Sequence, residues 1–288
     1  MCWAVALAVS LIKQVDAPIL LFGGAYGNLE ATEALFNEAS RHGIPNDYLI
    51  YTGDVVAYCA DAQKTVTLLR DNSIAVVMGS CDGQLGTGPP DCGCGFDEGT
   101  ACDLLSVQWY AFASAHLDED AKAWMSTLPH SIKLEIAGLE LKVVHGSVSE
   151  IAQFVFASTP RSVLIDEINL ANCDGVIGGH CGPPFTRVLD NKLWHNPRVI
   201  DMLANDGTPR VWYSILTSKD GALEFRHHAF TYDATGTAQK IHHEDLPAGY
   251  ADCLENDLWP SLEVLPEAER SATGQAIDLS TPIMFVTN

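Results

Sequence analysis

Five apolar segments, each followed by a turn that contains glycine, constrain the fold of this chain more than any other feature. They are Pro18–Phe22, Tyr48–Tyr51, Ile74–Met78, Leu141–Val144 and Gly175–Ile177. They are continuous hydrophobic runs rather than alternating ones, which is typical of strands buried on both faces. Helical patterns separate the first three: Leu29–Arg41 follows a candidate N-cap at Asn28, and Ala62–Arg70 follows one at Asp61. This order of segments predicts a layered α/β fold.

The rest of the chain predicts further helices and a second group of strands. Residues Leu104–Leu128 have the pattern of a helical hairpin broken near Leu117–Glu119, and Pro160–Ala171 and Ala234–His243 have the pattern of helices. From Thr186 onward, the segments FTRVLDNKLWHNP, RVWYSILTS and ALEFRHHAFTYD predict strands of a second, more antiparallel sheet.

We expect one domain over residues 1–288, with three peripheral parts. Residues 1–16 form an N-terminal extension. Residues 83–103, rich in Gly, Pro, Asp and Cys, form an irregular flap, since a long loop without periodicity usually has a function or is disordered. Residues 247–288 form an acidic tail that wraps the surface.

The charge and the N-terminal segment limit the classes of partner. The formal net charge is -21 and only 16 residues are Lys or Arg, which argues against nucleic acid as a partner. An anionic substrate would need a locally positive site, such as a metal. The first residues, MCWAVALAVSLIKQV, are apolar, but they lack a basic region and are too short to span a bilayer. We therefore expect a buried strand or helix there, no membrane partner and a cytoplasmic protein.

Candidate metal ligands follow three of the predicted strands. Asp54 follows the second apolar run, His145 the fourth and His180 the fifth, with Cys81 and Cys181 nearby. Ligands in layered α/β proteins bind at the carboxyl ends of the strands, so these side chains are expected to meet at one rim. One Asp and two His suit Zn²⁺, Fe or Mn²⁺. A single strand-end His is more often structural, but three such positions in series favour a shared site.

The ordered turns resemble the motifs of the calcineurin-like metallophosphoesterases, especially their compact bacterial branch. That family has D-x-H-G-N, G-D, G-N-H-D, H-G and G-H-x-H in series. This chain has GGAYGN, TGD, GSCD, VVHGS and GGHCG in the same order, and the resemblance covers about residues 17–245. It implies a four-layer α/β/β/α sandwich of two mixed β-sheets flanked by helices. It also implies two metals bridged by a carboxylate.

Carried over position by position, the resemblance implies that one metal site is lost. The bridging carboxylate corresponds to Asp54. Gly24, Tyr26 and Gly182 stand where the other ligands of the first metal would be. A two-metal phosphoesterase activity is therefore expected to be very weak or absent.

The ligands of the second metal are largely kept. His145 and His180 remain, and Ser80 replaces an asparagine. Cys81 replaces the general-acid histidine of the family, a loss that costs on the order of 10²–10⁴ in rate. Asp82, which in the family orients that histidine, is kept.

Two hypotheses about function remain open from the sequence. In the first, the chain is a hydrolase with a remodelled, mononuclear site, acting on a phosphoester or related bond of a small molecule. One divalent transition metal (Zn, Fe or Mn) would bind Asp54, His145 and His180, completed by Ser80, Cys81 or water, and Cys81, Asp82 and Tyr26 are the candidate catalytic residues. In the second, the chain is a non-catalytic pseudo-phosphoesterase that binds a ligand or a protein without metal.

Other residues are candidates for a supporting role around the site. They are Cys59, Cys181, His195 and Asn196. Thiolates favour Zn²⁺ or Cu(I) over Mg²⁺, so cysteines near the ligands would strengthen the first hypothesis. For Cys92, Cys94 and Cys102 in the flap, disulfide formation, metal binding and free thiols all remain open.

Overall fold

The strands of the computed structural model form two mixed sheets, within the residues that the structure describes: 9–12, 17–88, 92 and 98–286. Sheet I has the order β1 (Val9–Ile12), β5 (Ser131–Ile136), β6 (Leu139–Val144), β7 (Gly175–Gly178), β9 (Lys192–Asn196) and β8 (Phe185–Leu189). Sheet II has the order β12 (Ile283–Phe285), β11 (Ala222–Phe230), β10 (Val211–Lys219), β2 (Ile19–Phe22), β3 (Leu49–Tyr51) and β4 (Ala75–Val76).

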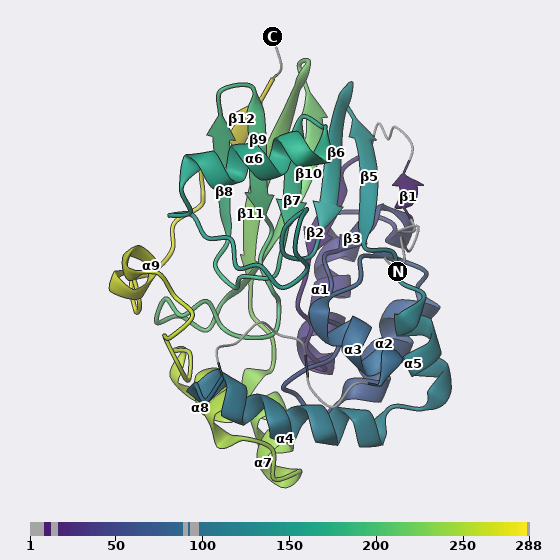
Figure 1. Ribbon diagram of the computed structural model, residues 1–288, viewed down its shortest axis with the longest axis vertical. Coiled ribbons are helices and arrows are strands. Elements are labelled where there is room, and N and C mark those ends of the chain that lie inside the picture. Colours follow the sequence, from purple (N-terminus) through teal and green to yellow (C-terminus); the bar gives the residue numbers. More distant parts are fainter. Residues whose placement is uncertain (1–8, 13–16, 89–91, 93–97, 287–288) are drawn as a thin grey trace, which may run out of the picture.

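The helices lie outside the two sheets (Figure 1). They are α1 (Leu29–Arg41), α2 (Ala62–Asp71), α3 (Ser80–Thr87), α4 (Ala101–His116), α5 (Glu119–Ser126), α6 (Arg161–Ala171), α7 (Ala234–His243), α8 (Ala248–Asn256) and α9 (Glu267–Ser271), with a 3₁₀ turn at Asn46–Tyr48. No helix in the described ranges is both long enough and apolar enough to cross a membrane.

Three hydrophobic clusters fix the layers. Alternate residues of a strand face opposite sides of its sheet. In β2, Ile19 and Leu21 therefore pack into the cluster between the sheets, whereas Leu20 and Phe22 pack against the cluster that contains residues of α1 and α2. On the far side of sheet I, Val176 packs in a third cluster with Leu164 of α6. The predicted four-layer sandwich of two mixed sheets flanked by helices is thus confirmed.

The predicted elements near the site are largely confirmed. Helices α1 and α7 have the predicted bounds, and the break between α4 and α5 falls at the predicted place. Asn28 caps α1, because its side chain accepts a hydrogen bond from the backbone N–H of Ala31. The strand β5, which lies in the stretch Ser131–Ile136, is an addition, and it pairs antiparallel with β6.

The strands after Thr186 differ from the prediction. They do not form a separate sheet: β8 and β9 belong to sheet I, where β9 pairs parallel with β7, whereas β10 and β11 belong to sheet II, where β10 pairs antiparallel with β2. The β8–β9 hairpin turns at Asp190, which has a φ of 56°. The strands of the later half therefore complete both sheets of the sandwich.

The flap and the tail also contain regular structure that was not predicted. Helix α3 extends to Thr87 and α4 begins at Ala101, so the irregular stretch is shorter than 83–103. Cys92 is disulfide-bonded, whereas Cys94 and the side chain of Cys102 lie outside the described part of the chain. The tail forms α8 and α9 and ends in β12, which pairs with β11.

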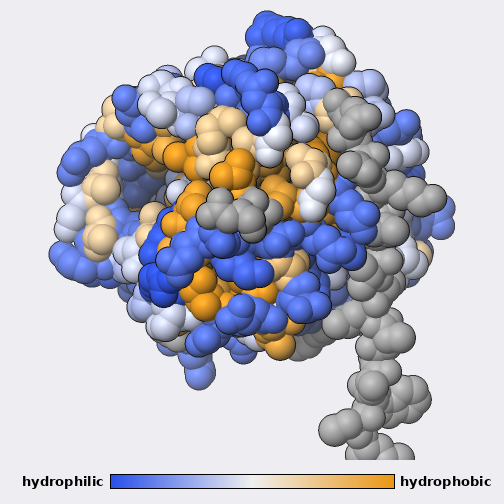
Figure 2. Space-filling model, turned by 90° about the horizontal axis from the view of Figure 1, so that it is seen from above, coloured by the Kyte–Doolittle hydropathy of each residue, from blue (hydrophilic) through white to orange (hydrophobic). Residues whose placement is uncertain are grey.

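The end of the sandwich at the top of Figure 1 lies away from the turns described below. Seen from above, it has hydrophilic residues along its margin and hydrophobic residues toward its middle (Figure 2).

Candidate metal centre

Turns from both sheets meet at one end of the sandwich and are joined through their backbones. The turn after β2 bonds to the turn after β3, because Gly24 donates to the carbonyl of Gly53 (3.0 Å) and Gly27 donates to that of Val55 (2.8 Å). Gly53 has a φ of 101°, and a Cβ there would lie 2.8 Å from Nδ1 of His145 in the turn after β6. Glycine at this position lets the two sheets bring their turns together.

Asp54, His145 and His180 form one buried cluster. Their ligand atoms all lie within 4.8 Å of one another, and it is the one group of its kind among the described residues. Nε2 of His145 lies 3.0 Å from Oδ2 of Asp54, and Nδ1 of His180 lies 2.9 Å from Nε2 of His145. The predicted convergence of these three residues is therefore observed, and it joins Asp54 of sheet II to two histidines of sheet I.

The second ring nitrogen of His145 has a partner outside the cluster. Nδ1 lies 2.8 Å from the backbone carbonyl oxygen of Thr52, which can only accept a hydrogen bond. His145 therefore carries a proton on Nδ1 and directs Nε2 toward Asp54 and His180. A backbone carbonyl on the far nitrogen is the usual arrangement that orients a metal-binding histidine.

The electrostatics of the cluster favour an ionised carboxylate. Burial acts to raise the pKa of Asp54, but the imidazoles of His145 and His180 outweigh burial and hold that pKa well below its usual range. Burial acts to lower the pKa of His145, yet the charge of Asp54 raises it above its usual value. The cluster thus combines an anionic carboxylate with imidazoles that attract protons, a donor set that also suits a divalent cation.

Helix α3 holds Asp54 in place from the other side. The backbone N–H of Cys81 donates to Oδ1 of Asp54 (2.9 Å). The carboxylate of Asp82 accepts hydrogen bonds from the backbone N–H groups of Asp54 (2.9 Å), Val55 (2.8 Å) and Gly79 (2.9 Å). Asp82 is wholly buried and faces this backbone, so it positions Asp54.

Cys81 and Ser80 lie at the start of α3, beside the cluster. The Cys81 side chain lines the pocket described below, and burial, Asp54 and Asp82 raise the pKa of its thiol well above the usual value. The Ser80 hydroxyl is buried and has no hydrogen-bond partner in the described part of the chain.

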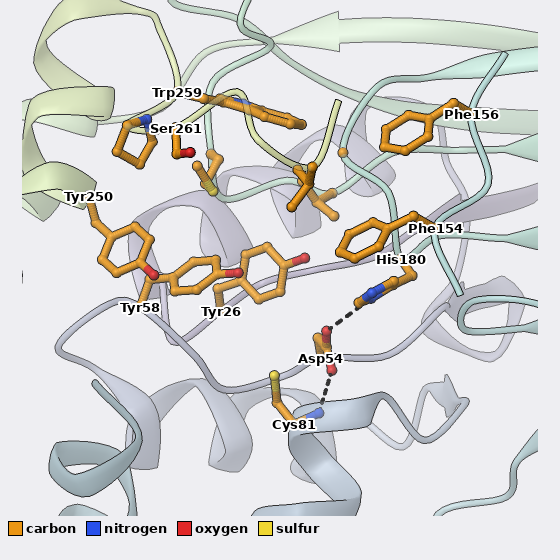
Figure 3. Close-up of a pocket in the computed structure, with 15 residues that line it drawn as sticks. Tyr26, Asp54, Tyr58, Cys81, Phe154, Phe156, His180, Tyr250, Trp259 and Ser261 are labelled. Atoms are coloured by element: carbon orange, nitrogen blue, oxygen red, sulfur yellow. Dashed lines mark hydrogen bonds and ion pairs between the residues drawn. The ribbon is translucent and has the colours of Figure 1, made fainter. Parts of the chain in front are cut away.

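A hollow of about 680 Å³, partly open to solvent, lies directly against Asp54 and His180. Tyr26, Tyr58 and Tyr250 lie along one side of it and Phe154 lies over His180 on the other, with Trp259 across the top (Figure 3). The rings of Phe154 and His180 are 4.4 Å apart, and those of Tyr58 and Tyr250 are stacked at 4.2 Å.

Hydrophobic side chains occupy the space beside two of the glycines that the sequence analysis singled out. A Cβ on Gly24 would lie 2.3 Å from Cγ1 of Val199, and Gly24 has a φ of 49°. A Cβ on Gly182 would lie 2.3 Å from the indole ring of Trp259, which is fixed by a hydrogen bond from Nε1 to the carbonyl oxygen of Leu203 (2.9 Å). Neither position has room for a larger side chain without movement of these neighbours.

Cys59 and Cys181, predicted to support the site, make their contacts elsewhere. The thiol of Cys59 donates to Oδ1 of Asp201 (3.2 Å) in a separate buried cluster. The thiol of Cys181 donates to the carbonyl oxygen of Val155, and the side chain of Asn196 donates to its sulfur (3.0 Å).

His195, predicted to approach the rim, instead points between the sheets. Its Nε2 lies 2.6 Å from Oγ of Ser214 on β10, and its Nδ1 lies 2.8 Å from Oγ1 of Thr186. Burial and the neighbouring His227 lower the pKa of His195 well below its usual value. Its side chain is on the face of β9 that meets sheet II, so it does not reach the cluster around Asp54.

Sequence reasoning missed most of the aromatic wall and a buried arginine. Tyr58, Phe154 and the pair Tyr250 and Trp259 come from three segments far apart in the chain, and no local motif marks them. Arg198 is wholly buried with a φ of 88°, and its guanidinium donates to the carbonyl oxygens of Val199 and Met202. The sequence NPR, at the end of the predicted strand segment FTRVLDNKLWHNP, was the available signal for Arg198.

Comparisons with known proteins agree on the fold. No family model matches the chain. An uncharacterized protein of Methanocaldococcus jannaschii is 24% identical over 250 residues, which cover 81% of this chain and 95% of that protein. The crystal structure of a hypothetical protein from Pyrococcus horikoshii matches with a TM-score of 0.71 and 13% identity, over 84% of this chain and 99% of that one.

A crystal structure with a functional description also matches. It is a metallophosphoesterase from Sphaerobacter thermophilus, with a TM-score of 0.64 and 18% identity, over 85% of this chain and 100% of that one. At these identities the likeness establishes the fold. The chain thus has the metallophosphoesterase fold, as its strand-end motifs predicted.

Proposed function

We propose that this chain is a metal-dependent hydrolase with a mononuclear site on the metallophosphoesterase fold. One divalent transition metal, Zn, Fe or Mn, would bind Asp54, His145 and His180, and the substrate would be a small molecule with a phosphoester or related bond. The observation that carries the proposal is the buried cluster of one carboxylate and two imidazoles, which opens onto the hollow through Asp54 and His180.

The donor set fits such a metal. It supplies three ligands of the types that catalytic zinc sites use, and it leaves room for water or substrate on the side of the hollow. The Thr52 carbonyl oxygen already holds the protonated Nδ1 of His145. The Ser80 hydroxyl, which has no hydrogen-bond partner in the described part of the chain, lies next to Cys81 in the sequence. When bound, a metal of this kind acts as a Lewis acid and lowers the pKa of a bound water.

The side chains of Cys81 and Tyr26, at the edge of the site, both stay protonated at neutral pH. Because its pKa is raised well above the usual value, the thiol of Cys81 stays protonated at neutral pH. It therefore suits a proton donor better than a nucleophile, which would have to be a thiolate. Burial, Asp54 and Cys81 likewise raise the pKa of Tyr26, so its hydroxyl is neutral and can donate a hydrogen bond to a bound molecule.

A single metal is proposed because the space for the other half of a dinuclear site is filled. Val199 occupies the space beside Gly24, and Trp259 occupies the space beside Gly182. These side chains are apolar or weakly polar and offer no hard ligand atoms for a divalent cation. Asp54 would therefore bind one metal together with His145 and His180, beside the aromatic hollow.

Substituting Gly24 tests whether this space is filled. Gly24→Ala is expected to lower the free energy of unfolding by roughly 3 kcal/mol, because overpacking against Val199 adds to the strain of a positive φ. Gly43→Ala is the matched control, since Gly43 has a φ of 65° with nothing within 4 Å of the added Cβ, and it should cost about 1 kcal/mol. Urea denaturation measures both. Equal losses in the two variants would show that the space beside Gly24 is open.

Metal binding is the direct test of the proposed site. Elemental analysis of protein purified without added metal, followed by titration with Zn²⁺, is expected to give one metal per chain. Asp54→Ala and His180→Ala should each abolish binding, because two ligands cannot hold the ion as three do. His116→Ala, an exposed histidine on α4, is the control and should bind as the unmodified protein does. The proposal fails if no transition metal co-purifies and none binds on titration.

A non-catalytic binding protein is the second candidate. The observation that favours it is that Asp54, His145 and His180 already satisfy one another by contacts of 2.9 and 3.0 Å. Hydrolysis of an ester that is lost in His145→Ala and retained in His116→Ala would exclude this candidate. Tight ligand binding without metal and without turnover would support it instead.

A further inference from the structure

The walls of the hollow beside Asp54 are built from aromatic rings in two groups. Tyr26 and Tyr58 lie with ring centroids 4.7 Å apart, and Tyr250 stacks on Tyr58. Across the hollow, Phe154 and Phe156 lie nearly parallel, with an angle of 7° between their planes (Figure 3). The two groups present ring faces and edges to the same space, which suits a planar aromatic ligand.

Two hydroxyl groups on the tyrosine side are available to a ligand. The hydroxyls of Tyr26 and Tyr58 make no hydrogen bond with the described residues, although both side chains line the hollow. Burial raises the pKa of both phenols well above the usual value, so both are neutral. Each can therefore donate to or accept from one polar atom of a bound molecule.

The charge of the hollow selects against polyanions. None of its described lining residues is Lys or Arg, and Asp54 contributes a negative charge. The chain as a whole carries a formal net charge of -21. A dianionic phosphate in this apolar space would meet repulsion from Asp54, and the described lining has no Lys or Arg to offset it.

The geometry points to a binding site for neutral, planar aryl compounds between the tyrosine group and the phenylalanine group, with the polar end of the ligand over Asp54 and His180. As a statement about substrate, namely an ester of an aromatic alcohol, this inference rests on the proposed function. Binding of the aryl group itself needs no metal. It uses the space that Tyr26, Val199 and Trp259 define beside the cluster.

Calorimetric titration of the full, chelator-treated chain with 2-naphthol tests the site. We expect saturable binding of one molecule per chain. Decahydro-2-naphthol, which has the same outline without the aromatic rings, should bind about fivefold more weakly. 2-Naphthyl phosphate should also bind more weakly than 2-naphthol, because it adds two negative charges.

Two variants locate the binding. Phe154→Leu should weaken 2-naphthol about fivefold, since it removes a ring but keeps an apolar side chain. Phe112→Leu is the matched control, because Phe112 is also partly buried and also lies against a histidine, with its ring 3.9 Å from that of His116 on α4. It should leave the affinity unchanged. Tyr26→Phe keeps the ring and removes only the hydroxyl, and it should weaken 2-naphthol by about fivefold.

The outcomes separate this inference from the proposed function. Absence of 2-naphthol binding, equal affinity for the saturated alcohol, or equal effects of Phe154→Leu and Phe112→Leu would each overturn the aryl site, whatever the metal titration gives. Tighter binding of 2-naphthyl phosphate than of 2-naphthol to the metal-free chain would overturn the charge argument. A failure of metal binding with normal 2-naphthol binding would leave the aryl site standing and remove the hydrolase.

Discussion

Asp82→Ala is expected to lower the free energy of unfolding by roughly 3–9 kcal/mol, because three buried backbone N–H groups each lose their acceptor at about 1–3 kcal/mol apiece. The carboxylate of Asp82 joins the turn after β3 to the start of α3. Asp54 lies in that turn with a φ of 63°, a strained conformation that its surroundings must hold. Loss of Asp82 should therefore also weaken metal binding at Asp54, although Asp82 bonds to the backbone of Asp54 and not to its carboxylate.

The control for this prediction is a carboxylate that caps a helix near the surface. Asp118 caps α5 by accepting one backbone hydrogen bond, from the N–H of Ala121 (2.7 Å), and its other oxygen accepts an exposed one from the side chain of Gln63 (2.9 Å). Asp118→Ala should therefore cost only about 1 kcal/mol. Guanidinium denaturation gives both values. If Asp82→Ala costs no more than Asp118→Ala, the turn does not depend on Asp82. If it is stable but inactive, Asp82 takes part in the chemistry directly rather than by position.

The sequence predicted the features of this fold that depend on local signals. Asn28 marks the start of α1 because an N-cap acts within one turn of helix, and the predicted bounds of that helix are those observed. The three metal candidates could be found because each follows a buried strand, and strand ends of both sheets meet at one end of the sandwich. That step needed only the order of the motifs along the chain.

Features that depend on contacts between distant segments were not predictable in this way. His195 follows a strand pattern as His145 does, but it lies within β9 and its side chain faces Ser214 of the opposite sheet. A shift of one residue along a strand reverses the face, and periodicity in a run buried on both sides does not fix it. Trp259 reaches Gly182 from the tail, and no property of the tail sequence indicates that contact.

The buried cluster around Asp201 yields a prediction about pH. Oδ1 of Asp201 accepts hydrogen bonds from the side chains of Asn28 (2.7 Å) and Cys59 (3.2 Å). Burial raises the pKa of Asp201 to about 7, although these hydrogen bonds and the more distant charge of Arg198 act to lower it. A carboxyl with a raised pKa is favoured in its protonated form within the fold.

Asp201→Asn is therefore expected to stabilise the protein at pH 8 and to have little effect at pH 3. In the unmodified chain, the unfolded state loses this proton near the ordinary pKa of 3.8, whereas the folded state keeps it until about pH 7. Stability falls as the pH rises between these values, by up to about 4 kcal/mol at about 1.4 kcal/mol per pKa unit. Asparagine keeps an oxygen for Asn28 and Cys59 and carries no charge, so the variant should lack that loss.

The difference between the stability of the unmodified chain and that of Asp201→Asn, followed against pH, isolates the contribution of Asp201 from those of the other buried acids. Asp54 and Asp82 titrate in both proteins and make no hydrogen bond with Asp201 in the described part of the chain. Their contributions therefore cancel in the difference between urea midpoints measured from pH 3 to pH 8. The difference should grow between about pH 4 and pH 7 and stay level above that. Parallel curves would mean that Asp201 is ionised within the fold at low pH. Arg198, which lies near it without an ion pair, would then stabilise the carboxylate despite its burial.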